Sequence, residues 1–279
     1  GAVGGLGYVS HTRGDAHYED AVGRIWRHGE SAGSDAAALR ELVRYATLAP
    51  SSHNTQCWRF RLEERRVSIA PDYGRRCPVV DPDDHHLFVS LGCAAENLVQ
   101  AGRAMGLRAE PEFVPGAGET VHIALKPAAV ERTPLFEAIP RRQSTRTEFD
   151  ARPPALDELK LLEAAGTGKG VLVQLLTEAR AMEEVLGFVV EGNTAQMRDP
   201  AFVRELKHWI RFNGGEAARL GDGLFSGASG NPSVPGWFGR LMFDAFFKEQ
   251  AENDKYARHV RSAAGIAVLR EIIDRDWCA

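Results

Sequence analysis

One stretch constrains the fold of this chain more than any other. It runs from Ala46 to Phe60 and reads ATLAPSSHNTQCWRF. Before it, apolar residues recur at helical spacing, so residues 36–48 are predicted to form an amphipathic helix that Pro50 ends. After it, apolar and charged residues alternate over residues 58–63, which is the period of a half-buried strand. The sequence therefore predicts a short polar loop held between a helix and a strand.

The predicted loop is dense in short hydrogen-bonding side chains. They are Ser51, Ser52, His53, Asn54 and Gln56. Such a loop could hydrogen-bond the edge of a planar heterocycle, or its side chains could cap their own backbone. The residue chemistry alone favours backbone capping, because short polar residues do this in most loops.

A second polar segment lies far downstream, where residues 141–146 read RRQSTR. Arginine forks suit a phosphate or the electron-rich edge of a heterocycle, since they offer paired donors and a charge that does not titrate. The alternative is a solvated basic turn that pairs with Glu148 and Asp150. Taken alone, the segment favours the solvated turn.

Both segments resemble motifs of one family. The stretch from Ala49 to Phe60, APSSHNTQCWRF, resembles the Ala-Pro-Ser-x-x-Asn-x-Gln-Pro-Trp-x-Phe signature of the nitroreductase family of flavoproteins. The segment from Arg142 to Arg146 resembles the Arg-x-Ser-x-Arg motif of the same family. Two such motifs in one chain are similar to the Acg-like branch, in which one polypeptide carries both halves of what is otherwise a dimer. Cys57 stands where the family usually has proline.

The resemblance implies a flavin site and no catalytic side chain, because in such proteins the flavin carries the chemistry. It implies that FMN is bound by Ser51, Ser52, His53, Asn54, Gln56, Arg141, Arg142, Ser144 and Arg146. The loop residues would meet the ring edge, and the arginine segment would serve the phosphate and the N1/O2 side.

The implied activity is electron transfer from NAD(P)H through FMN to a nitroaromatic, a quinone or a similar acceptor. NAD(P)H would bind transiently, since the chain has no fingerprint for a tightly held nicotinamide. The alternative is a protein that binds or sequesters flavin without turnover.

The expected fold class is α+β, with a nitroreductase-like mixed sheet flanked by helices and two pseudo-symmetric lobes. Residues 1–30 are expected as an N-terminal segment, either a leader remnant or a linker, residues 31–135 as the first lobe and residues 136–279 as the second. The resemblance implies that the second lobe lacks its C-terminal part. A monomeric pseudo-dimer or a weak homodimer is expected.

Glycines crowd residues 213–239, which are predicted to form a long irregular lid over the site. Phe225 and Trp237 are candidate stacking groups in this lid, although either could simply pin it to the body of the protein. The remaining elements are expected as strands at 67–70, 107–115, 121–126, 171–176 and 263–269, and as helices at 87–106, 133–139, 156–165, 179–193, 199–212 and 241–247.

Charge and composition exclude several classes of protein. The 279 residues carry a formal net charge of -4, so nothing indicates a nucleic-acid partner. The chain has no apolar run long enough to span a membrane, and a cytoplasmic and an exported location both stay open. The four cysteines show no metal-ligand spacing, so no metal site is expected. Clustered arginines, such as Arg75 and Arg76, suggest at most an anionic small molecule.

Overall fold

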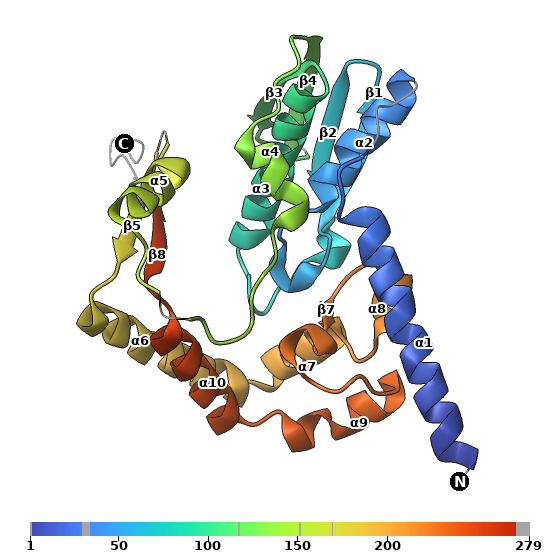
Figure 1. Cartoon of the computed structure of the whole chain (residues 1–279), viewed down its shortest axis with the longest axis vertical. Coiled ribbons are helices and arrows are strands. Elements are labelled where there is room, and N and C mark those ends of the chain that lie inside the picture. Colours follow the sequence, from blue (N-terminus) through green and yellow to red (C-terminus); the bar gives the residue numbers. More distant parts are fainter. Residues whose placement is uncertain (1, 30–33, 117, 151, 169, 272–279) are drawn as a thin grey trace. The chain divides into compact units, whose positions relative to one another are not determined.

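The computed structural model describes residues 2–29, 34–116, 118–150, 152–168 and 170–271, and it divides into two compact units (Figure 1). Unit 1 comprises Gly1–Ser144 and Arg204–Met242, and unit 2 comprises Thr145–Val203 and Phe243–Ala279. The chain thus enters each unit twice. The expected lobes at 31–135 and 136–279 stay a prediction.

A four-stranded antiparallel sheet is the framework of unit 1. Its strands are β1 (Trp58–Glu63), β2 (Arg66–Pro71), β3 (Leu107–Val114) and β4 (Thr120–Pro127), in the order β1-β2-β4-β3. The predicted hairpin is confirmed, since β3 pairs with β4 from Leu107↔Pro127 to Val114↔Thr120. The sheet and its helices give the chain the mixed helix-and-strand architecture that was expected.

Two helices, α2 (Asp35–Thr47) and α3 (His85–Ala104), pack against each other, and α3 also packs on the sheet (Figure 1). Their apolar faces and the inward faces of β2 and β4 form the core. Its fully buried side chains include Leu42, Leu91, Leu98, Val67, Ile69 and Ile123. This packing fixes the end of α2, from which the polar loop leaves toward β1.

The other elements of unit 1 surround this core. They are α1 (Ala2–Ile25), α4 (Pro134–Ala138), most of α7 (Pro200–Trp209), β6 (Ile210–Arg211), α8 (Gly214–Leu220), β7 (Leu224–Phe225), most of α9 (Gly236–Phe246) and the 3₁₀ turns Ser52–Asn54, Tyr73–Arg75, Ile139–Arg141 and Ser226–Ser229. The expected leader or linker segment is thus largely the helix α1. No described helix has both the length and the apolar character needed to cross a membrane.

The prediction of an irregular stretch at residues 213–239 is wrong. It contains α8, β7, a 3₁₀ turn and the start of α9. Asn213 caps α8, because its side chain accepts a hydrogen bond from Glu216 N at 2.8 Å. Gly221 ends the helix in the left-handed conformation, with φ 66°. The glycines that suggested irregularity therefore partly mark the ends of a helix.

Unit 2 combines three helices with a two-stranded antiparallel sheet. Its elements are α5 (Leu156–Gly166), β5 (Val171–Leu176), α6 (Ala179–Arg198), α10 (Glu249–Ser262) and β8 (Ile266–Glu271). Helices α6 and α10 pack together, and the buried Asn253 joins them by hydrogen bonds with Asn193 and Thr194. The expectation about the C-terminal end falls largely on residues 272–279, outside the described residues.

Candidate functional site

The loop between α2 and β1 holds three non-glycine residues in the left-handed backbone region. They are His53, Asn54 and Gln56, with φ of 48°, 51° and 55°. Such conformations cost free energy and persist where the surrounding structure over-determines them, which occurs often at binding sites. Here the turn is closed by Asn54 N donating to Ser51 O at 2.9 Å and by Gln56 N donating to Ser51 Oγ at 3.2 Å. Ser51 thus caps its own loop.

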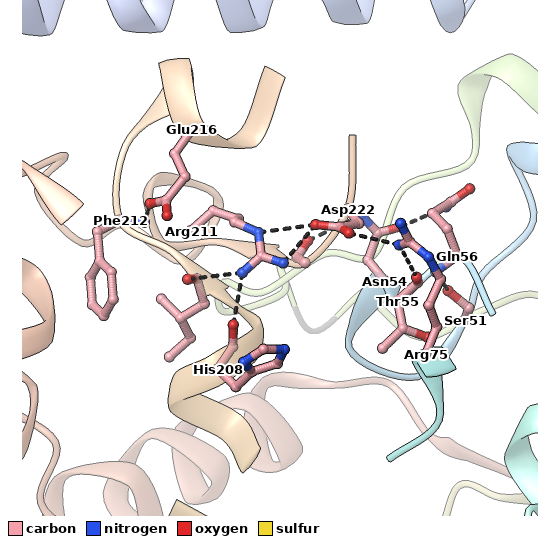
Figure 2. A network of polar contacts seen from close by, with 12 residues as sticks. Ser51, Asn54, Thr55, Gln56, Arg75, His208, Arg211, Phe212, Glu216 and Asp222 are labelled. Carbon is pink, nitrogen blue, oxygen red and sulfur yellow. Dashed lines mark hydrogen bonds and ion pairs between the residues drawn. The ribbon is translucent and has the colours of Figure 1, made fainter. Parts of the chain in front are cut away.

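Asn54 joins this loop to the segment that follows α8. Its side-chain Nδ2 donates to Gly223 O at 3.0 Å, and its backbone carbonyl oxygen accepts from Gly223 N at 2.8 Å. Gln56 Nε2 donates to Asn54 Oδ1 at 3.0 Å, so both ends of the Asn54 amide are used within the protein (Figure 2). The hydroxyl of Ser52 and the side-chain carbonyl of Gln56 have no hydrogen-bond partner in the described part of the chain.

A buried ion pair is linked to the loop by hydrogen bonds. Arg211 donates from Nε and Nη2 to Asp222 Oδ1 at 3.0 and 2.6 Å, and the two residues are 5% and 8% exposed. Arg75 Nη1 donates to Asp222 Oδ2 at 2.7 Å and to Thr55 O at 2.9 Å, which links the pair to the loop (Figure 2). This network was not predicted, because Asp222 lies 147 residues from Arg75.

The upstream arginines form ion pairs within the protein. Arg75 pairs with Asp222, and Arg76 Nη1 lies 3.2 Å from Asp84 Oδ2. That these arginines serve an anionic small molecule stays a prediction. They neutralise carboxylates of the protein itself.

The residues of the downstream arginine motif have different surroundings. Arg142 Nη2 donates to Leu48 O at 3.2 Å, at the end of α2 where the polar loop begins. The Arg142 guanidinium also lies 5.4 Å from the centre of the Trp26 ring. Partial burial lowers the pKa of Arg142, which still leaves it charged at neutral pH. No carboxylate of a described residue lies within ion-pair distance of it.

The other three predicted site residues of this segment, Arg141, Ser144 and Arg146, have different surroundings from Arg142. Arg141 Nε donates to Glu137 O at 3.1 Å and so turns back onto α4. Ser144 is exposed and ends the first segment of unit 1, whereas Arg146 belongs to unit 2. The structure therefore brings Arg142 alone of this motif to the loop within one unit.

The two aromatic residues of the predicted lid, Phe225 and Trp237, have different surroundings in unit 1. The ring of Phe225 lies 4.5 Å from that of Tyr18 in α1, so it pins its segment to the helix. Trp237 is 71% exposed, and its ring contacts that of Phe238 at 5.7 Å. The contact with Tyr18 fits the interpretation that Phe225 anchors its segment to the rest of the protein.

The described cysteines, Cys57, Cys77 and Cys93, are free thiols. Burial raises the pKa of the Cys57 thiol, and hydrogen bonds with Ser90 and Thr55 oppose this shift. Burial and the nearby Glu205 carboxylate raise the pKa of Cys77 to about 12. Burial also raises the pKa of Cys93, so these three thiols are protonated at neutral pH.

Comparison with known proteins shows distant homology to two relatives. No protein-family model matches the chain. It is 27% identical over 180 residues to "Putative NAD(P)H nitroreductase Rv3131" from Mycobacterium tuberculosis strain ATCC 25618 / H37Rv. The same values hold for "Putative NAD(P)H nitroreductase MT3217" from Mycobacterium tuberculosis strain CDC 1551 / Oshkosh. Each match covers 63% of this chain and 52% of the relative, so it spans about half the length of these proteins.

Proposed function

We propose that this chain is an FMN-binding oxidoreductase of the nitroreductase type, with both lobes of the site in one polypeptide as in the Acg-like branch. One observation carries the proposal. Arg142, from the second motif, donates a hydrogen bond to Leu48 O at the start of the loop that forms the first motif. The names of the two distant relatives support the same kind of activity.

The groups around the loop fit the chemistry of FMN. A guanidinium carries five N–H donors, and the carbonyl of Leu48 takes one donor of Arg142. Its remaining donors suit a phosphate or the electron-rich edge of a flavin, and no described carboxylate competes for them. Ser52 and Gln56 add an unused hydroxyl and an unused carbonyl to the same loop. Asn54 fits less directly, because a flavin would have to replace one of its two hydrogen bonds.

In this proposal the protein positions the cofactor. FMN, when bound, would supply hydride acceptance and electron transfer. The charge of Arg142 would hold the anionic part of the ligand at the end of α2. The loop keeps its left-handed shape through Gly223 and Ser51, so that binding would require little further ordering. Asp222 and Arg211 would contribute indirectly, by keeping Arg75 and the carbonyl of Thr55 in place.

The donor in this proposal is NAD(P)H, and the acceptor is a nitroaromatic, a quinone or a similar electrophile. Donor and acceptor would stack in turn on the exposed face of the flavin ring, so neither needs a dedicated phosphate-binding loop. A monomeric pseudo-dimer or a weak homodimer is the expected assembly.

The visible spectrum of the purified full chain tests this function. After addition of FMN and removal of excess by gel filtration, the protein should keep the absorbance of oxidised flavin, and anaerobic NAD(P)H should bleach it. Flavin that stays bound but does not bleach would favour a flavin-binding protein without turnover. A chain that retains no FMN would contradict both functions.

A further inference from the structure

A second cluster of chemically active side chains lies in unit 1. It consists of His53 from the loop, Cys77 from the segment after β2, and Glu205 from α7. One ligand atom from each residue, an imidazole nitrogen, the Cys77 sulfur and a carboxylate oxygen, lies within 4.8 Å of the other two. Cys77 is 4% exposed, and the other two residues are partly buried.

Each of the three residues sits on a backbone that other contacts hold in place. Glu205 Oε2 and Oε1 accept hydrogen bonds from Val79 N at 3.0 Å and Val80 N at 3.1 Å. These two amides belong to the turn that begins at Cys77, and Asp81 N closes that turn by donating to Cys77 O at 2.8 Å. The turn therefore orients the carboxylate of Glu205 and the thiol of Cys77 together.

His53 is fixed by the loop described above. It has φ 48° and ψ 20°, an uncommon conformation for a residue other than glycine. Its neighbour Asn54 is tied to Gly223 by hydrogen bonds in both directions. The imidazole therefore reaches the cluster from a loop that is anchored on both sides.

The combination of donors points to a transition-metal ion. One imidazole, one thiolate and one carboxylate are ligand types of Zn²⁺ sites. The Cys77 thiol would release its proton to solvent on binding, and the two anionic ligands would then match the charge of the ion. In a tetrahedral zinc site, bond lengths of about 2.0–2.3 Å place ligand atoms about 3.3–3.8 Å apart. The three ligand atoms lie within 4.8 Å of one another, so side-chain rotations would have to close the remaining distance to this spacing.

We propose that His53, Cys77 and Glu205 form a binding site for one Zn²⁺ ion, with a fourth position open to water or a small ligand. Hydrogen bonds that orient a ligating carboxylate are typical of metal sites, and Val79 and Val80 supply them here. The spacing of the cysteines in the sequence gave no sign of this site, because its ligands come from positions 53, 77 and 205. The site does not depend on the proposed flavin function.

Zinc binding by the purified full chain tests the proposal. After treatment with a chelator and dialysis, calorimetric titration should show one Zn²⁺ bound per chain. Replacing Zn²⁺ by Co²⁺ should give a thiolate-to-cobalt charge-transfer band, which reports directly on a bound cysteine. Cys77→Ser should abolish this band and weaken Zn²⁺ binding at least about tenfold, since loss of groups that merely orient ligands already costs that much.

Control variants separate this site from other cysteines and histidines. Cys93→Ser and His86→Ala remove potential ligands outside the cluster and should leave both the affinity and the cobalt band unchanged. Glu205→Gln keeps the shape of its side chain and should weaken binding at least about tenfold without loss of fold in circular dichroism. Absence of stoichiometric Zn²⁺ binding by the unmodified chain would overturn the proposal, as would a cobalt band that survives Cys77→Ser.

Discussion

At the scale of single residues, Asp222 is the group on which the polar interior of unit 1 depends. It accepts from Arg211 at 2.6 and 3.0 Å and from Arg75 at 2.7 Å, and Arg75 in turn holds the carbonyl of Thr55. Arg211 is almost fully buried, so its charge is compensated mainly by this carboxylate. A buried charge that loses its partner is strongly destabilising.

Asp222→Asn should therefore lower the free energy of unfolding by about 3 kcal/mol, because Arg211 stays buried without a counter-charge. Urea denaturation followed by circular dichroism measures this change. The matched control is Asp20→Asn, which removes an exposed partner of Arg24 and should cost less than about 0.5 kcal/mol. Equal costs for the two variants would contradict the assignment of Asp222.

Asp72 gives a prediction that depends on pH. Its Oδ1 accepts from Arg59 Nη2 at 2.9 Å and from Gly74 N at 3.1 Å, and the hydrogen bond from Arg59 is the main cause that lowers the pKa of Asp72. A lowered folded-state pKa means that the carboxylate contributes stability above its unfolded pKa, and that this contribution is lost as the pH falls through the folded-state pKa.

Asp72→Asn should accordingly cost about 0.5–1 kcal/mol at pH 7, a value kept small because Arg59 is exposed. The difference between variant and wild type should shrink as the pH falls below about 3.9, the ordinary pKa of aspartate, and should vanish below the lowered folded-state pKa, where the wild-type side chain is neutral as well. Denaturation curves at several pH values measure this difference in the free energy of unfolding. A difference that grows at low pH would show that the sign is wrong.

Part of the candidate site could be predicted residue by residue. The sequence places Ser51, Ser52, His53, Asn54 and Gln56 together, because they are neighbours in one short loop. It could not show that Asn54 uses its amide on Gly223, since that contact spans 169 residues. The Asp222 network and the His53 cluster are hidden for the same reason.

At the scale of elements, the loop between α2 and β1 is shaped by its contact with the segment after α8. Gly223 has φ +80°, and a Cβ there would lie 2.4 Å from Trp209 O and 2.8 Å from Arg211 Nε. Only glycine allows the backbone to pass this close while forming both hydrogen bonds with Asn54. The shape of the loop therefore depends on a glycine far from it in the sequence.

Gly223→Ala should destabilise the protein clearly more than Gly221→Ala, by about 2 kcal/mol or more. Gly221 has φ +66° but open space around its Cα, so alanine there costs only the left-handed strain of about 1–2 kcal/mol. Thermal and urea denaturation of both variants measure the difference. Similar costs at the two positions would contradict the close approach seen at Gly223.

Elements with a clear period were predicted well, and those set by long-range packing were not. The helix α2, which ends shortly before Pro50, the β3–β4 hairpin and the apolar helix α3 follow from local patterns. The segment from residue 213 to 239 was misread, because its glycines mark helix ends and close contacts as well as turns. Helix α10 was missed, since it is mostly polar and its buried Asn253 forms hydrogen bonds with α6, far away in the sequence.

At the scale of the whole molecule, the two units differ in how much apolar surface they bury. The large core cluster lies entirely in unit 1, between α2, α3, α4 and the four-stranded sheet. In unit 2, by contrast, large apolar side chains such as Leu161, Phe188 and Leu269 are mostly exposed. Local stability follows buried apolar contacts and protected backbone hydrogen bonds.

Hydrogen exchange followed by mass spectrometry should therefore find the slowest amides in β2, β4 and α3. Amides of β5 and β8 should exchange earlier, because a two-stranded sheet has marginal stability on its own. Protection of β5 and β8 equal to that of β2 and β4 would contradict this order.

The central claim is that the loop at residues 51–56 and Arg142 bind one FMN together. Flavin fluorescence during titration of the full chain measures this binding for the wild type and for Arg142→Gln, with Arg103→Gln as a control in which an exposed arginine of α3 loses its charge. We predict that one FMN binds per chain. Arg142→Gln should lower the FMN affinity about 10- to 150-fold, because it removes a charge-assisted contact worth about 1.5–3 kcal/mol. Arg103→Gln should leave the FMN affinity unchanged. Equal affinities for all three proteins, or no binding by the wild type, would contradict the claim.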